Sequence, residues 1–67
     1  MKNRSLRDEV KNIVKNKENV SKVYRGVIGG QPSIEIAEIE PKSVNSIMYT
    51  SEKDRDEDLN ELQSLLK

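Results

Sequence analysis

The sequence predicts a single small α+β domain in which two helices flank a β-hairpin or a three-stranded antiparallel sheet. Two apolar patterns with a helical period, one near each end, enclose a middle rich in Val, Ile and Tyr that Gly29-Gly30 interrupts. A chain of 67 residues provides one hydrophobic core and no more. We therefore expect residues 1–67 to form one domain in the order α-β-β-β-α, or α-β-β-α if the third β-rich run is not a strand.

The first helix is expected over residues 5–17. Ser5 can accept a hydrogen bond from an amide of the first turn, and Asp8 follows three residues later, which is the spacing of a capping box. Apolar side chains then recur on one helical face, at Leu6, Val10, Ile13 and Val14. The polar residues 16–19 are expected to end this helix.

Two strands are expected at 20–28 and 33–40, joined by the four-residue connection 29–32. We expect Ile28 to pair with Ser33 across this hairpin. The apolar alternation of the second strand breaks at Ala37-Glu38, after which Ile39 falls on the face opposite to Ile34. A β-bulge there restores a single apolar face. Without one, both faces of the sheet carry apolar side chains and both need cover.

The run 46–50 contains Ile47 and Tyr49, and its composition favours a third strand. The alternative is an early start of the last helix, which is expected over 52–66 with Thr50 or Ser51 as its cap. Acidic residues fill its first turns, as a helix N-terminus prefers. Its apolar stripe consists of Leu59, Leu62 and Leu66, with Leu65 beside them.

Composition argues against enzymatic chemistry. The chain has no His and no Cys, so histidine acid–base catalysis, thiol nucleophiles and zinc sites built from these residues are excluded. The acidic run that begins at Asp54 has the start of a calcium loop, but Leu59 stands where Gly is required and Leu65 where Glu is required. We expect no catalytic residue, no cofactor and no metal site.

Compartment is predicted from what the sequence lacks. No apolar run has the length of a signal-peptide core or of a membrane span. We therefore expect a cytoplasmic protein that makes no membrane contact.

The leading functional hypothesis is a small regulatory or accessory protein that binds another protein and forms a homodimer. It follows from the lack of catalytic groups and from a small core, since only 33% of the residues are hydrophobic. The candidate contact surface combines apolar residues of the third strand and the last helix: Ile47, Tyr49, Leu59, Leu62, Leu65 and Leu66.

Charge segregation supports two alternatives. The chain is neutral overall, but residues 1–25 hold eight basic and three acidic groups, whereas residues 26–67 hold four basic and nine acidic groups. The first alternative is nucleic-acid binding, and its candidate contacts are Arg4, Arg7, Lys11, Lys15, Lys22 and Arg25. The second is an acidic antagonist that presents the carboxylates of residues 52–61 to a basic target.

Overall fold

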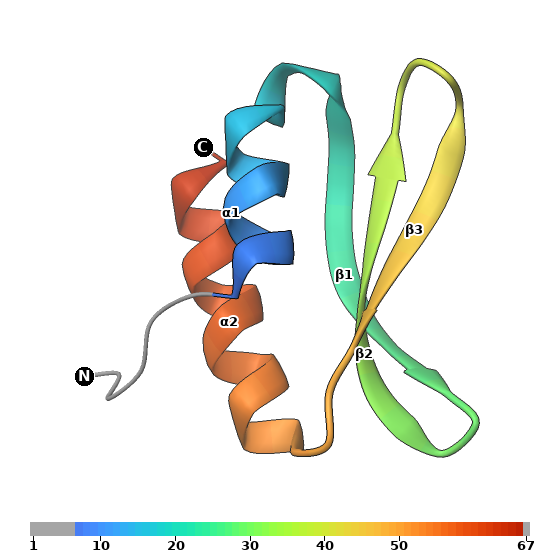
Figure 1. The fold of residues 1–67 in the computed structure, drawn as a ribbon, viewed down its shortest axis with the longest axis vertical. Coiled ribbons are helices and arrows are strands. Elements are labelled where there is room, and N and C mark those ends of the chain that lie inside the picture. Colours follow the sequence, from blue (N-terminus) through green and yellow to red (C-terminus); the bar gives the residue numbers. More distant parts are fainter. Residues whose placement is uncertain (1–6, 67) are drawn as a thin grey trace.

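The computed structural model describes residues 7–66. Its elements are, in chain order, α1 (Asp8–Lys15), a 3-10 turn (Lys17–Asn19), β1 (Val20–Ile28), β2 (Gln31–Glu38), β3 (Ser43–Met48) and α2 (Glu52–Leu65). The three strands form one antiparallel sheet in the order β1-β2-β3. Both helices lie together on one face of this sheet (Figure 1). The predicted α+β class is therefore confirmed, in its α-β-β-β-α form.

Helix α1 is shorter than the predicted range 5–17. It begins at Asp8 after Arg7, whose side chain makes no capping hydrogen bond, while the predicted cap Ser5 lies outside the described residues. The helix ends where Asn16 donates from both its backbone and its side-chain nitrogen to the Asn12 carbonyl oxygen. Val10 is fully buried on the inner face of α1.

The β1–β2 hairpin turns through Gly29 and Gly30 alone. Their φ angles are 58° and 81°, and glycine adopts this left-handed region without a steric cost. Ile28 therefore pairs with Gln31, so the predicted pairing with Ser33 was wrong by two residues. Because side chains alternate with a period of two, this shift leaves the residues from Lys22 to Ile28 on their predicted faces.

A β-bulge lies in β1 opposite Ala37-Glu38, where the sequence pattern breaks its phase. The extra residue is Ser21. The bulge places Val20 on the same face as Val23, and both pack against the core. The bulge thus turns Val20 of β1 toward the core, while Ile39 after β2 stays exposed.

Asn19 fastens the β2–β3 connection to the start of β1. Its side-chain amide donates to the Glu40 carbonyl at 2.9 Å and accepts from the Glu40 amide at 3.0 Å. The Ile39 amide also donates to the Asn19 carbonyl oxygen. The side chain of Asn19 therefore continues the ladder for one step beyond the strands.

The third β-rich run is a strand, and it covers 43–48 rather than 46–50. After it, the chain enters α2 through Ser51, whose hydroxyl accepts from the Asp54 amide at 3.4 Å. Of the two predicted caps, Ser51 is therefore the one used.

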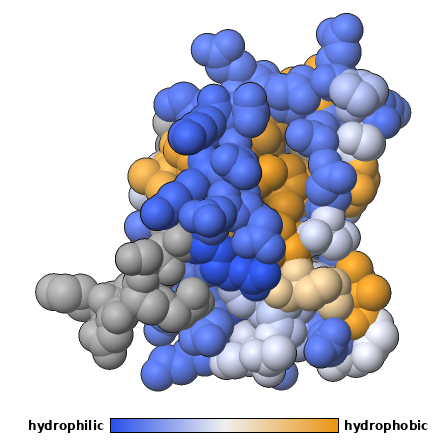
Figure 2. All heavy atoms as spheres, in the orientation of Figure 1, coloured by the Kyte–Doolittle hydropathy of each residue, from blue (hydrophilic) through white to orange (hydrophobic). Residues whose placement is uncertain are grey.

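The core lies between the two helices and the sheet. Its fully or nearly buried apolar members are Val10, Ile34, Ile36, Ile47, Tyr49, Leu59 and Leu62. Figure 2 shows the same layering, with apolar atoms between the helices and the strands and hydrophilic atoms over the outer side of α1. The shortest dimension is 17 Å, which is consistent with two layers of secondary structure.

Candidate protein-binding surfaces

The two faces of the sheet have different surroundings. Residues that pair across antiparallel strands project to the same side. On the helix side this places Ile34 and Ile36 with Val23 and Ile47, and on the other side it places Tyr24 with Glu35. We call the latter side the open sheet face; its members are Lys22, Tyr24, Gly26, Ile28, Gln31, Ser33, Glu35, Ala37, Val44, Ser46 and Met48. No helix or strand of residues 7–66 covers it (Figure 1).

Apolar side chains are exposed on the open sheet face. Tyr24 is 39% exposed and Val44 is 56% exposed, and Ile28 at the hairpin end is also exposed. The Nζ atom of Lys22 lies 5.2 Å from the centroid of the Tyr24 ring, which is within the range of a cation–π contact. The flanks of this face therefore present apolar and aromatic surface.

Glu35 makes the centre of the open sheet face polar. Its two carboxylate oxygens accept hydrogen bonds from the hydroxyls of Ser33 and Ser46, each at 2.6 Å. Gly26 lies on β1 opposite Ser33 and leaves room for the carboxylate. A Cβ added at Gly26 would lie only 2.6 Å from Glu35 Oε2. The carboxylate is thus held in place by two neutral donors, without a cation bound to it in the described residues.

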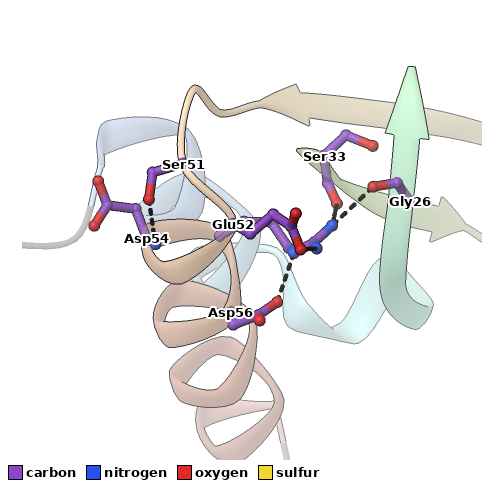
Figure 3. Close-up of polar contacts among 7 residues, drawn as sticks. Gly26, Ser33, Ser51, Glu52, Asp54 and Asp56 are labelled. Atoms are coloured by element: carbon purple, nitrogen blue, oxygen red, sulfur yellow. Dashed lines mark hydrogen bonds and ion pairs between the residues drawn. The ribbon is translucent and has the colours of Figure 1, made fainter. Parts of the chain in front are cut away.

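Arg55 anchors α2 to the hairpin from inside the protein. The residue is only 2% exposed, and its Nη1 atom donates to the Gly26 carbonyl at 2.8 Å and to the Ser33 carbonyl at 3.3 Å (Figure 3). Its Nε atom donates to Asp56 Oδ1 at 2.6 Å, and the carboxylate of Glu52 lies 3.9 Å from Nη2. These contacts satisfy a buried cation and fix the angle between α2 and the sheet.

A second polar contact joins α2 to the end of β3. The Tyr49 hydroxyl donates to Asp58 Oδ2 at 2.6 Å, and Asp58 is fully buried. The guanidinium of Arg7 lies 4.6 Å from the centroid of the Tyr49 ring and donates to the Met48 carbonyl. Arg7 also pairs with Glu9 at 2.9 Å. A hydrogen bond from its own backbone amide, and then the Arg7 contact, lower the pKa of Glu9.

A groove runs between the edge strand β1 and helix α2; we call it the β1–α2 groove. One part, of about 370 Å³, lies between Tyr24-Arg25 and the helix residues Asp56, Leu59, Asn60 and Gln63. The other part, of about 200 Å³, lies between residues 20–23 and the helix residues Gln63 and Leu66, with Lys17 at its end. Gln63 separates the two parts, and its Nε2 atom donates to the Val23 carbonyl at 3.4 Å.

Most of the predicted protein-contact residues lie inside the protein. Ile47, Tyr49, Leu59 and Leu62 are core residues with little or no exposed area, and Leu66 packs against the core. Leu65 alone among the six is exposed, at 41%. The large apolar residues that are exposed instead are Tyr24, Val27, Ile28, Ile39, Val44 and Leu65, and three of them, Tyr24, Ile28 and Val44, lie on the open sheet face.

The predicted nucleic-acid contacts divide between the two layers. Lys11 and Lys15 are exposed on α1, whereas Lys22 projects from the open sheet face on the opposite side of the sheet. Arg25 is exposed on β1. Arg7 is half-buried and engaged as described, and Arg4 lies outside the described residues. The structure therefore does not gather the five described side chains of this set into one continuous patch.

The sequence analysis did not predict that Arg55 and Asp58 are buried. A signal for Arg55 was present, because the positions 55, 59, 62 and 66 share one helical face with spacings of four, three and four. A charged side chain in an acidic segment does not, by type, indicate burial. Gly26 likewise gave no sign in the sequence of the carboxylate that it accommodates.

Comparison with known proteins adds no relative: no family model, no curated protein and no solved structure matches the chain. Neither described helix has the length and apolar character needed to cross a membrane. Within residues 7–66, no group of three acidic residues is arranged so that it could hold a metal ion.

Proposed function

We propose that this protein acts without catalysis, by binding protein, and that a second copy of the chain covers its open sheet face. The observation that carries the proposal is the open sheet face itself, with exposed Tyr24, Ile28 and Val44 and no covering element in the described residues. Exposed aromatic and branched aliphatic side chains gain free energy when a second layer covers them. A second identical sheet provides that layer.

Charge supports a second copy as the occupant. The open sheet face holds one cation, Lys22, and one carboxylate, Glu35. Each face is therefore neutral as a whole, so two of them meet without net repulsion about a two-fold axis, which is the common symmetry of dimers. The chain is also neutral as a whole, so long-range repulsion between copies is absent.

The size of the open sheet face indicates a weak dimer. Three strands at about 4.8 Å and eight residues at about 3.3 Å give a flat area of about 380 Å² per copy, or about 760 Å² for both. Stable interfaces start at about 1,200 Å². We therefore expect a reversible, concentration-dependent dimer with a dissociation constant in the micromolar range or above.

Sedimentation velocity from about 10 to 500 µM protein tests this proposal, a range that brackets the micromolar dissociation constant expected of a small interface. The wild-type chain is expected to shift from monomer to dimer over this range. Val44→Glu, which places a carboxylate in the interface, is expected to remain monomeric. Leu65→Glu is the matched control, because Leu65 is exposed to a similar degree but lies on α2, in the other layer. A monomer at all concentrations, or equal dimerisation of both variants, contradicts the proposal.

A further inference from the structure

We infer that the β1–α2 groove binds an extended acidic segment of another protein, which adds to β1 as a fourth strand. This inference rests on the proposed protein-binding function. It uses the outer edge of β1 and the adjoining side of α2, and this surface shares only Lys22 and Tyr24 with the open sheet face. The following four features of the groove support it.

The first feature is the outer backbone edge of β1, which pairs with no other strand of the described residues. Ile28 and Gln31 close a two-residue turn, and hydrogen-bonded pairs recur at every second residue from there. Val23, Arg25 and Val27 therefore direct their amide and carbonyl groups away from β2, toward the outer edge. These groups form the ladder that an added strand requires.

The second feature is Gln63, which marks the position of that strand. Its side-chain amide donates to the outward carbonyl of Val23 at 3.4 Å, a long hydrogen bond from an exposed residue. A peptide amide at the same position makes a shorter bond with better alignment. Displacing Gln63 also joins the two parts of the groove, because this side chain lines both of them.

The third feature is the apolar and spacious interior. Leu59 lines one part of the groove, and Val20, Val23 and Leu66 line the other. The larger part, at about 370 Å³, falls within the size range of ligand pockets. Because side chains of a strand alternate between its two sides, every second residue of the added segment enters this space.

The fourth feature is charge, which selects the occupant. Strand β1 carries Lys22 and Arg25 and no acidic residue, and Lys17 lies at one end of the groove. Asp56 on the helix side is bound to Arg55 Nε at 2.6 Å. A second copy of β1 would bring like charges together along the new ladder, which is unfavourable. Arg25 projects to the same side of β1 as Val23. An acidic residue beside Arg25 and an aliphatic residue two positions away, beside Val23, therefore complement both the charge and the interior.

Selection from a displayed library of random seven-residue peptides on the immobilised full chain tests the inference. We expect enrichment of peptides that carry an acidic and an aliphatic residue two positions apart, on the side of the strand that faces the groove. An enriched peptide is expected to bind Arg25→Glu about tenfold more weakly or worse in fluorescence anisotropy, because a charge attraction becomes a repulsion. Lys11→Glu makes the same charge change on α1 and is expected to bind like wild type. Circular dichroism melts serve to check that both variants are folded.

Strand addition itself has a separate measurement. Hydrogen exchange followed by NMR is expected to show new protection of the Val23, Arg25 and Val27 amides when the enriched peptide binds. Two peptides with every second amide N-methylated test the same point. Methylation of the amides that face β1 is expected to abolish binding, whereas methylation of the alternate set is expected to leave binding nearly unchanged. Absence of enrichment, equal binding by Arg25→Glu, or full binding of both methylated peptides overturns the inference.

The two proposals fail independently. Val44→Glu changes the open sheet face and is expected to bind the enriched peptide like wild type. Arg25→Glu changes the groove and is expected to dimerise like wild type. If Val44→Glu dimerises like wild type, the dimer proposal alone is wrong. If Arg25→Glu binds the peptide like wild type, the groove proposal alone is wrong.

Discussion

Arg55 is a charged side chain at a position where the helical period of α2 places a core residue. Its guanidinium bridges the carbonyls of Gly26 and Ser33, one from each strand of the hairpin. The hydrogen bonds between the buried guanidinium and the two buried carbonyls offset the free-energy cost of removing these groups from water. At the scale of single residues, this contact determines how α2 meets the sheet.

Replacing Arg55 by Met is expected to lower the free energy of unfolding by about 2 kcal/mol, because hydrogen bonds from a charged donor are lost inside the protein. Urea denaturation followed by circular dichroism measures this. Lys53→Met, at an exposed position in the same helical turn, is the control and is expected to change stability by less than about 0.5 kcal/mol. Equal stability of the two variants shows that the Arg55 contacts contribute nothing.

Gly26 and Glu35 are expected to be energetically coupled. Gly26→Ala puts a Cβ within 2.7 Å of Glu35 Cγ and 2.8 Å of Ser33 Oγ, so the carboxylate has to leave its two serine donors. We expect this substitution to cost about 1 to 2 kcal/mol in the wild type and about 0.5 kcal/mol or less in a Glu35→Ala background. A double-mutant cycle by urea denaturation measures the coupling, and an equal cost in both backgrounds contradicts it.

At the scale of elements, the β1–β2 hairpin sets the register of the whole sheet. Gly29 and Gly30 both have positive φ, and nothing lies within 4 Å of a Cβ added at either position. The turn is therefore governed by backbone conformation alone. Such two-residue turns favour Asn at the first position and Gly at the second.

Two substitutions in this turn are expected to change the stability of the protein in opposite directions. Gly29→Asn is expected to stabilise the protein by a few tenths of a kcal/mol, because Asn tolerates this conformation and restricts the unfolded chain. Gly30→Val is expected to destabilise it by about 1 to 2 kcal/mol, because a β-branched residue is strained at positive φ. Thermal melts of both variants test this, and destabilisation by Gly29→Asn contradicts the expected turn geometry.

The elements also show how far the sequence determines the structure. The order of elements and the inner and outer faces of the hairpin follow from periodicity, because both survive a two-residue error in register. The exact register depended on whether Pro32 belongs to the turn. Pro32 in fact lies in β2. A proline fits there because the pairing of β2 with β3 starts only at Ser33, so no ladder hydrogen bond requires the amide hydrogen that proline lacks.

The candidate surfaces were less predictable than the fold. Leucines and aromatic residues were predicted as contacts by type, yet the core takes most of them, because a small chain has few others with which to fill it. The open sheet face depends on which side both helices cover, and that is a tertiary property. What the pattern did indicate was apolar residues on both sides of the sheet, of which only the helix side is covered within the described residues.

At the scale of the whole molecule, the segregated charges are divided among surfaces rather than gathered on one. Lys22 shares its face with Glu35, while Lys11 and Lys15 lie in the other layer. Binding to nucleic acid depends on several cations that meet neighbouring phosphates at once. This arrangement is therefore a weak basis for the nucleic-acid alternative.

Anisotropy titrations with a labelled single-stranded RNA and a DNA duplex are expected to stay flat at low salt, about 50 mM, where phosphate contacts are strongest. A protein that binds neither under these conditions lacks a phosphate-contacting surface. Binding with a steep inverse dependence on salt, lost in Lys11→Glu and Lys15→Glu, instead supports the nucleic-acid alternative.

The most direct test of the central claim is a concentration series of two-dimensional ¹H–¹⁵N NMR spectra of the wild-type chain. If copies meet through their sheets, amide signals of the open sheet face, such as those of Tyr24, Glu35 and Val44, shift progressively with concentration. Signals of the outer side of α1, such as that of Lys11, stay fixed. Shifts confined to the helices, or no shifts up to millimolar protein, contradict the account.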